Sequence, residues 1–297
     1  MAIRAKFVRM QLDILKPFLT GCSIKTSRAG QTKLGNLMAS THKRLVNYSP
    51  VPFDSFFAEM ITPKSQKLDG VILYLHGGGY VTGDINYSKG FGTILSAENN
   101  IKVFCIAYRL APENPFPAAL EDAFSAYQYL LANGYKEKDI ILCGESAGGG
   151  LIYSLCLKLK EQNLPLPCGI IAISPWTDLT SKGKSYDENF DNDPSMTKER
   201  LQYFASLYAK DYTDPFVSPL FGELQGMPPS LMFVGGDEIM LDDSVEMHRK
   251  LLESGSKAEL IITPKMWHGY VLYGLKETKQ DNEKMTEFIM EVLHEKP

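Results

Sequence analysis

The sequence has few cysteines, and their spacing excludes several kinds of site. Its 297 residues include five cysteines, and no two of them form the C-x-x-C pair found in zinc and redox motifs. Three lie in or beside apolar runs that are typical of buried strands: Cys105, Cys143 and Cys168. We therefore expect reduced core thiols in a cytoplasmic protein that holds neither a metal ion nor a cofactor.

The chain also lacks a large excess of positive or negative charge. The chain has 31 lysines and arginines against 35 acidic residues, a formal net charge of -4, and its basic residues are scattered. Nucleic acid is therefore not an expected partner. Charged residues also interrupt the N-terminal apolar stretch, which removes the unbroken segment that a signal peptide or a membrane span needs. We expect neither export by that route nor stable membrane insertion.

The N-terminal stretch has the pattern of an amphipathic helix. Its apolar residues recur every three or four positions, at Ile3, Phe7, Met10, Ile14 and Phe18. Such a helix either packs on its own protein or lies on a membrane surface. Packing on the protein is the simpler interpretation, and we favour it.

From Asp69 onward, short apolar runs alternate with helical stretches. Six runs read GVILYLHGGG, IKVFCIAY, DIILCG, CGIIAISPW, SLMFVGGD and AELIITP. Runs that are apolar throughout are typical of strands covered on both faces of a parallel sheet. Crossover helices are expected over PAALEDAFSAYQYLLANG, after Ser146, and over DDSVEMHRKLLESG. The alternation predicts a doubly wound α/β sheet, with a first strand in PVPFDSFFAEMIT and a last helix in KETKQDNEKMTEFIMEVLHEK.

Two regions do not fit this alternation, residues 1–50 and about 181–225. The second places many aromatic side chains between two strand runs, and so much apolar surface needs something to cover. We therefore expect a helical cap, built from both regions, on a catalytic domain that spans residues 51–297. The candidate pocket residues are aromatic, and spacing does not decide among them: Tyr80, Phe190, Tyr203, Phe204 and Tyr208.

Polar residues follow four of the predicted strands. The segment HGGG begins at His76 after one strand, Ser146 follows a second, Asp237 a third, and His268 lies just past a fourth. Because ligands bind beyond the carboxyl ends of strands in an open parallel sheet, these residues are expected to meet at one edge.

Ser146 lies in LCGESAGGG, where glycine and alanine surround one hydroxyl and one acid. The pattern fits a plain tight turn, and it also fits a strained turn that presents a nucleophile. A serine nucleophile needs a base and an acid that orients the base. Among the five histidines, His268 alone sits on a loop after a late strand, which gives the order serine, acid, histidine that such hydrolases use.

The acid must come from the carboxylates between Ser146 and His268. Asp237 directly follows a strand and a Gly-Gly turn, so we favour it. Glu238 and Asp242 are the alternatives, although acids there also suit the start of a helix.

The glycines of HGGG suit a site that binds an oxyanion. Backbone N–H groups of Gly78 and Gly79 can approach a carbonyl oxygen closely, together with the N–H of Ala147 after the nucleophile. A phosphate-binding loop is the competing interpretation. Neither glycine cluster has G-x-x-x-x-G-K-[ST] or G-x-G-x-x-G with its following acid, so we do not favour it.

These segments resemble the hormone-sensitive-lipase-like branch of the α/β-hydrolases, which includes microbial carboxylesterases and acetyl esterases. HGGGYVTGD resembles the oxyanion motif, YRLAPENPFPAALEDA the signature after the fourth strand and GESAGG the elbow; SPWTDL, VSPLFGEL, GGDEIMLDDS and WHGY follow in the family's order. The resemblance implies an α/β-hydrolase fold: a mostly parallel eight-stranded sheet, helices on both faces and a helical cap. It also implies a triad of Ser146, Asp237 and His268, and oxyanion donors Gly78, Gly79 and Ala147.

Two residues depart from the family pattern. Glu145 stands before the nucleophile, where Asp is commoner, and Tyr80 stands after the glycines, where Trp or Phe is commoner. In YRLAPENPFP, prolines stiffen the connection between strand and helix, and Arg109 and Glu113 can pair inside it.

These features together predict a serine carboxylesterase for short- to medium-chain acyl esters, with a small-molecule ester as its partner. A lactone, amide or thioester hydrolase would use the same triad. A non-catalytic small-molecule receptor on this fold is the alternative from another class, and the presence of His268 argues against it. The sequence does not set the oligomeric state, and a homodimer stays open.

Overall fold

Eight strands form one sheet in the computed structural model, which describes residues 4–294 apart from the side chains of Leu19 and His294. The strand order is β1-β2-β4-β3-β5-β6-β7-β8; the two pairs that involve β2 are antiparallel, and all pairs from β4 to β8 are parallel. The strands are β1 (Val46–Pro52), β2 (Phe57–Pro63), β3 (Val71–Leu75), β4 (Lys102–Ala107), β5 (Ile140–Glu145), β6 (Gly169–Ile173), β7 (Ser230–Gly235) and β8 (Ala258–Thr263). The predicted doubly wound, mostly parallel sheet of eight strands is confirmed.

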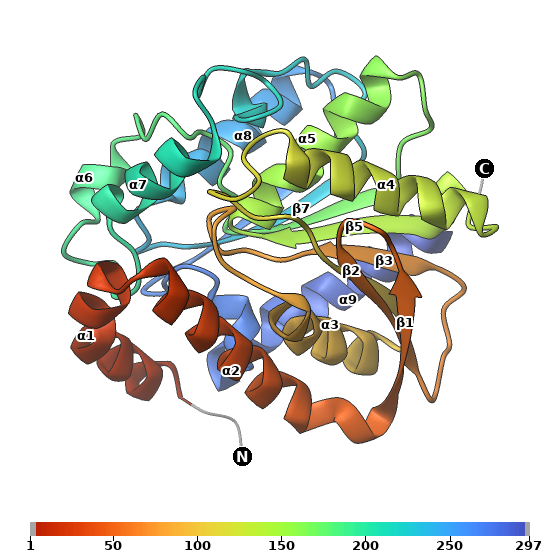
Figure 1. Ribbon diagram of the computed structural model, residues 1–297, viewed down its shortest axis with the longest axis horizontal. Helices are drawn as coiled ribbons and strands as arrows, with labels where there is room; N and C mark the ends of the chain where they lie inside the picture. The colour runs from red at the N-terminus through yellow and green to blue at the C-terminus, as the bar shows by residue number, and fades with distance from the viewer. Residues whose placement is uncertain (1–3, 295–297) are drawn as a thin grey trace.

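Helices cover both faces of this sheet (Figure 1). One face carries α4 (Ala118–Ala132), α5 (Ala147–Glu161) and α8 (Leu241–Glu253), and the other carries α3 (Ile85–Asn99) and α9 (Lys279–His294). The central strands β3 and β5 are buried along their whole length, as their unbroken apolar runs predict. The outermost strand β8 is only half-buried, so the expectation of cover on both faces is wrong there.

The segment PVPFDSFFAEMIT forms two strands where one was expected. β1 and β2 pair as an antiparallel hairpin whose turn contains Asp54 and Ser55, residue types that favour turns. β1 lies at the edge of the sheet, the position where its prolines Pro50 and Pro52 can be accommodated. The strand begins at Val46, inside the region that was assigned to the cap.

The regions assigned to the cap contain four α-helices among the described residues. They are α1 (Ala5–Gly21), α2 (Ile24–His42), α6 (Ser185–Glu188) and α7 (Lys198–Tyr208). Figure 1 shows α1 beside α6 and α7, while α2 runs along α3 of the main domain. Short 3₁₀ helices span Lys43–Leu45, Glu137–Asp139, Pro219–Phe221, Tyr270–Tyr273 and Lys276–Thr278.

The helix α1 packs on the protein, but with the face opposite to its apolar stripe. Val8 is buried, whereas four residues of the stripe are 51–73% exposed: Phe7, Met10, Ile14 and Phe18. Ile3, the first member of the stripe, lies outside the described residues. Helix α1 therefore contacts its own protein, but the apolar stripe on which that interpretation rested stays exposed. None of the helices in residues 4–294 has both the length and the apolar character that crossing a bilayer requires.

Arg109 pairs within the strand-to-helix connection, but not with Glu113. Its guanidinium and its backbone N–H donate to the buried Asp122 carboxylate at 2.7–3.0 Å. Glu113 instead accepts two hydrogen bonds from Arg28 of α2, at 2.8 and 2.7 Å. The expected pair inside the connection is therefore wrong, and Glu113 ties the N-terminal region to it.

Replacing Arg109 with Met should lower the free energy of unfolding by about 2 to 3 kcal/mol, because the buried Asp122 carboxylate loses its charged partner. The measurement is equilibrium unfolding in urea. Arg249→Met removes an arginine that also pairs with two carboxylates, but at an exposed position, and should leave the urea midpoint unchanged. Equal effects of the two substitutions would contradict the importance of burial.

Candidate active site

Ser146 is the single residue between strand β5 and helix α5. Its backbone has φ 53° and ψ -121°, a conformation that costs energy for a residue with a side chain. Hydrogen bonds hold it there: its N–H donates to Ile173 at 2.9 Å, and its carbonyl accepts from Gly150 at 3.0 Å and Trp176 at 2.9 Å. Such a strained corner lifts the side chain out of the backbone path, as the motif predicts.

The small residues around Ser146 are required by close backbone contacts. A Cβ atom at Gly148 would lie 2.0 Å from the carbonyl oxygen of Leu75, at the end of β3. A Cβ atom at Gly144 would lie 2.3 Å from the carbonyl oxygen of Gly148. The two glycines therefore let the first turn of α5 press against both its own strand and the neighbouring strand β3.

The segment HGGG forms a tight turn beside this corner. Gly78 and Gly79 have φ values of 111° and 63°, and the Gly78 carbonyl accepts the N–H groups of Val81 and Thr82. Ala147 is the first residue of α5, so its N–H has no carbonyl partner in its own helix. Since β3 and β5 are neighbours, the three predicted oxyanion donors lie on adjacent turns.

His76 shapes the same turn, as the sequence predicts. Its Nδ1 donates to the Gly77 carbonyl at 2.7 Å, and its ring stacks on Tyr108 with centroids 4.3 Å apart. Burial lowers the pKa of His76 to about 4, so the ring is neutral at physiological pH. It is therefore a structural residue of the turn.

Glu145 anchors the other side of the turn, a role that the sequence left open. Its buried carboxylate accepts the N–H of Gly77 at 2.6 Å and the hydroxyl of Tyr74 at 3.0 Å. Burial raises the pKa of Glu145, and these hydrogen bonds, together with one from Tyr87, lower it only in part. The acid beside the nucleophile thus holds the glycine turn in place.

His268 contacts Glu238, which corrects the choice of Asp237 as the acid that faces it. Its Nδ1 lies 2.8 Å from Oε2 of Glu238, whose side chain has no exposed surface. The other oxygen, Oε1, accepts the N–H of Gly235 at 2.5 Å and the hydroxyl of Ser174 at 2.9 Å. The turn after β7 folds the longer Glu238 side chain back toward β6, and the imidazole meets it there.

Asp237 points the other way and pairs with α1. Its Oδ2 lies 2.6 Å from Nη1 of Arg9, and the same nitrogen donates to the carbonyl of Lys265 at 2.9 Å. Asp242, the third candidate, accepts the N–H of Ser185 at 3.0 Å. The sequence therefore predicts the correct turn, the one after β7. It does not show which carboxylate of this turn faces His268.

Ser174 belongs to the site and was missed from the sequence. Its hydroxyl donates to Glu238 and accepts the N–H of Gly269 at 3.0 Å, so it joins the acid to the loop that carries His268. It follows strand β6 directly, and its φ is 46°. Its signal in the sequence is its position, since Ser174 opens SPWTDL directly after a strand, as the other polar residues of the site follow theirs.

Three carboxylates act on the His268 imidazole. Burial lowers its pKa, but the hydrogen bond and charge of Glu238, with the charges of Asp193 and Glu145, outweigh that effect. The pKa of His268 is therefore raised above its ordinary value of 6.5. Its side chain remains 12% exposed, which leaves an edge of the ring open.

The structure brings together three of the five candidate pocket residues. Tyr80 and Tyr208 are buried and stack with centroids 3.8 Å apart. The Phe204 ring packs on the glycine turn, since a Cβ atom at Gly79 would lie 2.4 Å from its Cδ2. Phe190 and Tyr203 are 44% and 46% exposed, and the Phe190 ring lies under the ammonium of Lys16.

The described part of the chain offers no cluster of three or more His, Cys, Asp or Glu side chains that could hold a metal ion. Of the five cysteines, Cys105, Cys143 and Cys156 are buried, while Cys22 and Cys168 are half-buried.

A serine on a strained strand-to-helix turn, at the same edge of the sheet as a histidine held by a buried acid, is the arrangement shared by hydrolases with a nucleophile elbow. Comparison with known proteins agrees with this class. Residues 72–272 match the family described as having the alpha/beta hydrolase fold. The chain belongs to this family, in the branch of the bacterial hormone-sensitive-lipase esterases.

Relatives of this branch are similar over most of the chain. An esterase of Acinetobacter venetianus is 37% identical over 73% of this chain and 74% of its own length. An acetyl-hydrolase of Streptomyces hygroscopicus is 35% identical over 73% of each chain. The crystal structure of an esterase from the bacterial hormone-sensitive lipase family is 32% identical, covers 99% of this chain and 100% of that chain, and superposes with a TM-score of 0.88.

The two neighbouring acids should behave differently when each is replaced by its amide. Glu238→Gln should lower kcat by roughly 10⁴-fold, because the amide no longer fixes the productive tautomer of His268 or stabilises its cation. Asp237→Asn loses only the ion pair to Arg9 and should keep most of kcat. Steady-state kinetics on a chromogenic butyrate ester distinguish them, and a larger loss in Asp237→Asn would reverse the assignment.

Proposed function

We propose that this protein is a serine carboxylesterase that hydrolyses short- to medium-chain acyl esters through an acyl-enzyme. The observation that carries the proposal is that the end of β6 holds both the proposed nucleophile, Ser146, and the loop of the proposed base, His268. The N–H of Ser146 donates to Ile173, and Gly269, next to His268, donates its N–H to Ser174. Consecutive residues therefore support the two reacting groups.

The reaction uses each of these groups in turn. His268 accepts the Ser146 proton as the hydroxyl attacks the ester carbonyl, and it returns that proton to the leaving alcohol. It then activates a water that hydrolyses the acyl-enzyme. Glu238 orients the imidazole and stabilises its cation, while the N–H groups of Gly78, Gly79 and Ala147 bind the oxyanion.

The aromatic residues beside the oxyanion turn support a short acyl group. Phe204 packs directly on Gly79, and the stacked rings of Tyr80 and Tyr208 fill the neighbouring space. In this proposal residues 1–50 and 181–225 form the cap, and Phe204 and Tyr208 of α7 bring its aromatic surface to the site. Lactones, amides and thioesters would use the same triad, so matched substrates of each class belong in the same assay.

The nucleophile and the substrate class can be tested together. Ser146→Ala should abolish hydrolysis of a chromogenic acetate or butyrate ester while the thermal unfolding midpoint is retained. In an acyl series from acetate to laurate, the wild type should peak at short or medium chains. Full activity of Ser146→Ala would exclude the triad, and a peak at the longest chains would exclude the substrate class.

The decrease of kcat/KM at acidic pH should report the pKa of His268, the proposed base. Only neutral His268 can accept the serine proton, and its pKa is raised above 6.5. The decrease of kcat/KM on acidification should therefore be centred at a pH higher than 6.5. Initial rates on a butyrate ester across neutral pH would measure this limb. An acid limb below pH 6.5 would show that the carboxylates around His268 do not act on the free enzyme as described.

A further inference from the structure

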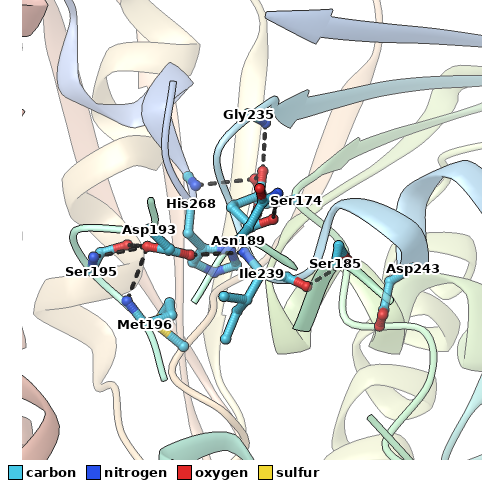
Figure 2. Close-up of polar contacts among 12 residues, drawn as sticks. Ser174, Ser185, Asn189, Asp193, Ser195, Met196, Gly235, Ile239, Asp243 and His268 are labelled. Atoms are coloured by element: carbon cyan, nitrogen blue, oxygen red, sulfur yellow. Dashed lines mark hydrogen bonds and ion pairs between the residues drawn. The ribbon is translucent and has the colours of Figure 1, made fainter. Parts of the chain in front are cut away.

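Asp193 is a buried carboxylate in the insertion between β6 and β7, and the proposed reaction does not use it. It has no exposed surface. Its Oδ1 accepts the N–H and hydroxyl of Ser195, each at 2.8 Å, and the N–H of Met196 at 3.1 Å. Its Oδ2 accepts the N–H of Ile239 at 3.0 Å, which joins the insertion to the turn after β7. The four contacts can be followed in Figure 2.

The bond to Ile239 reaches the peptide group that directly follows Glu238. The carbonyl of that same peptide accepts Nδ2 of Asn189 at 3.0 Å, so two residues of the insertion hold its two polar ends. Because the C=O and N–H of a trans peptide point in opposite directions, the insertion fixes the plane of this peptide. The Cα atom of Glu238 lies at one end of this peptide, so fixing the peptide also fixes the point from which the Glu238 side chain extends.

Helix α1 holds the insertion from outside. Nζ of Lys16 donates to the carbonyls of Asp193 at 2.6 Å and Phe190 at 2.9 Å, and Nη2 of Arg9 donates to Asn192 at 2.5 Å. The Asp193 carboxylate thus accepts hydrogen bonds only from uncharged donors in these contacts. The cations of Arg9 and Lys16 contact backbone oxygens of the insertion instead. Its negative charge acts on His268 together with Glu238 and Glu145.

We infer that Asp193 is a positioning residue of the proposed triad: with Asn189 it clamps the peptide after Glu238, and its charge stabilises the imidazolium of His268. The inference rests on the proposed function. It joins the cap to the acid and base directly, so that a correctly docked insertion is a condition for a correctly oriented histidine.

Asp211 provides a matched control in the same insertion. Its Oδ1 accepts the N–H and hydroxyl of Thr213 at 2.8 and 2.7 Å, which repeats the turn that Asp193 makes with Ser195. Asp211 is exposed, and both of these bonds stay within its own turn. A role confined to this local turn would therefore give the two aspartates equal importance.

The test compares Asp193→Asn with Asp211→Asn in the full chain. Asp193→Asn should lower kcat on a butyrate ester by roughly tenfold or more, because an amide cannot accept from both sides as the carboxylate does. It should also move the acid limb of kcat/KM to lower pH, because one negative charge near His268 is lost. Asp211→Asn should change neither quantity.

Two outcomes in folded Asp193→Asn would overturn the inference: an unchanged kcat, or a lower kcat with an unmoved acid limb, which a purely structural role would give. If Asp193→Asn does not fold, Asn189→Ala takes its place. That variant should lower kcat and leave the acid limb in position, and full kcat would count against the clamp.

A further measurement separates this inference from the proposed function. Titration of the His268 ring by NMR in Ser146→Ala, with and without Asp193→Asn, needs no activity. The pKa of His268 should be lower with the second substitution. If Ser146→Ala is inactive but the two titrations coincide, only the role of Asp193 fails; if Ser146→Ala keeps full activity, the proposed function fails.

Discussion

The candidate site depends on how one buried carboxylate is satisfied. Glu238 has no exposed surface, and a charge removed from water is tolerated only where hydrogen bonds replace its hydration. Gly235 and Ser174 occupy one oxygen, which leaves the other for His268. Each partner comes from the end of a different strand or the loop beyond it, so the parallel sheet must be in register before the acid can be buried at all.

The same requirement explains why two adjacent acids have separate tasks. Asp237 and Glu238 follow one strand, yet the first is partly exposed and faces α1 while the second is buried and faces the base. The longer side chain can fold back beneath the turn, and the shorter one can reach outward. The connection between β7 and α8 thereby contacts helix α1 on one side and the proposed catalytic groups on the other.

Much of the fold could be predicted from the sequence, because apolar runs of strand length are unambiguous when they alternate with helices. Ser146, His268 and the glycine turn also lie beyond strand ends, as the sequence predicts, and strand ends share one edge. Their roles in the reaction stay predictions. The choice between Asp237 and Glu238 could not be made in this way. It depends on the direction of a side chain, which Ser174 and Gly235 decide from positions distant in the sequence. The hairpin before β3 was missed because a turn of Asp and Ser is a weak signal beside two apolar runs.

Helix α1 shows a second limit, since its amphipathic pattern was recognised but its orientation was not. Hydrophobicity alone would turn Phe7, Ile14 and Phe18 inward, whereas Arg9 and Lys16 make the contacts to the insertion and the acid turn. Attachment through charged groups responds to solution conditions differently from attachment through an apolar face. Counterions screen it within a Debye length of about 8 Å at physiological ionic strength, while the salts that strengthen apolar burial give it no support. Rising ionic strength should therefore weaken the charged part of this attachment, while Val8, Ala5 and Leu12 still pack against the apolar core.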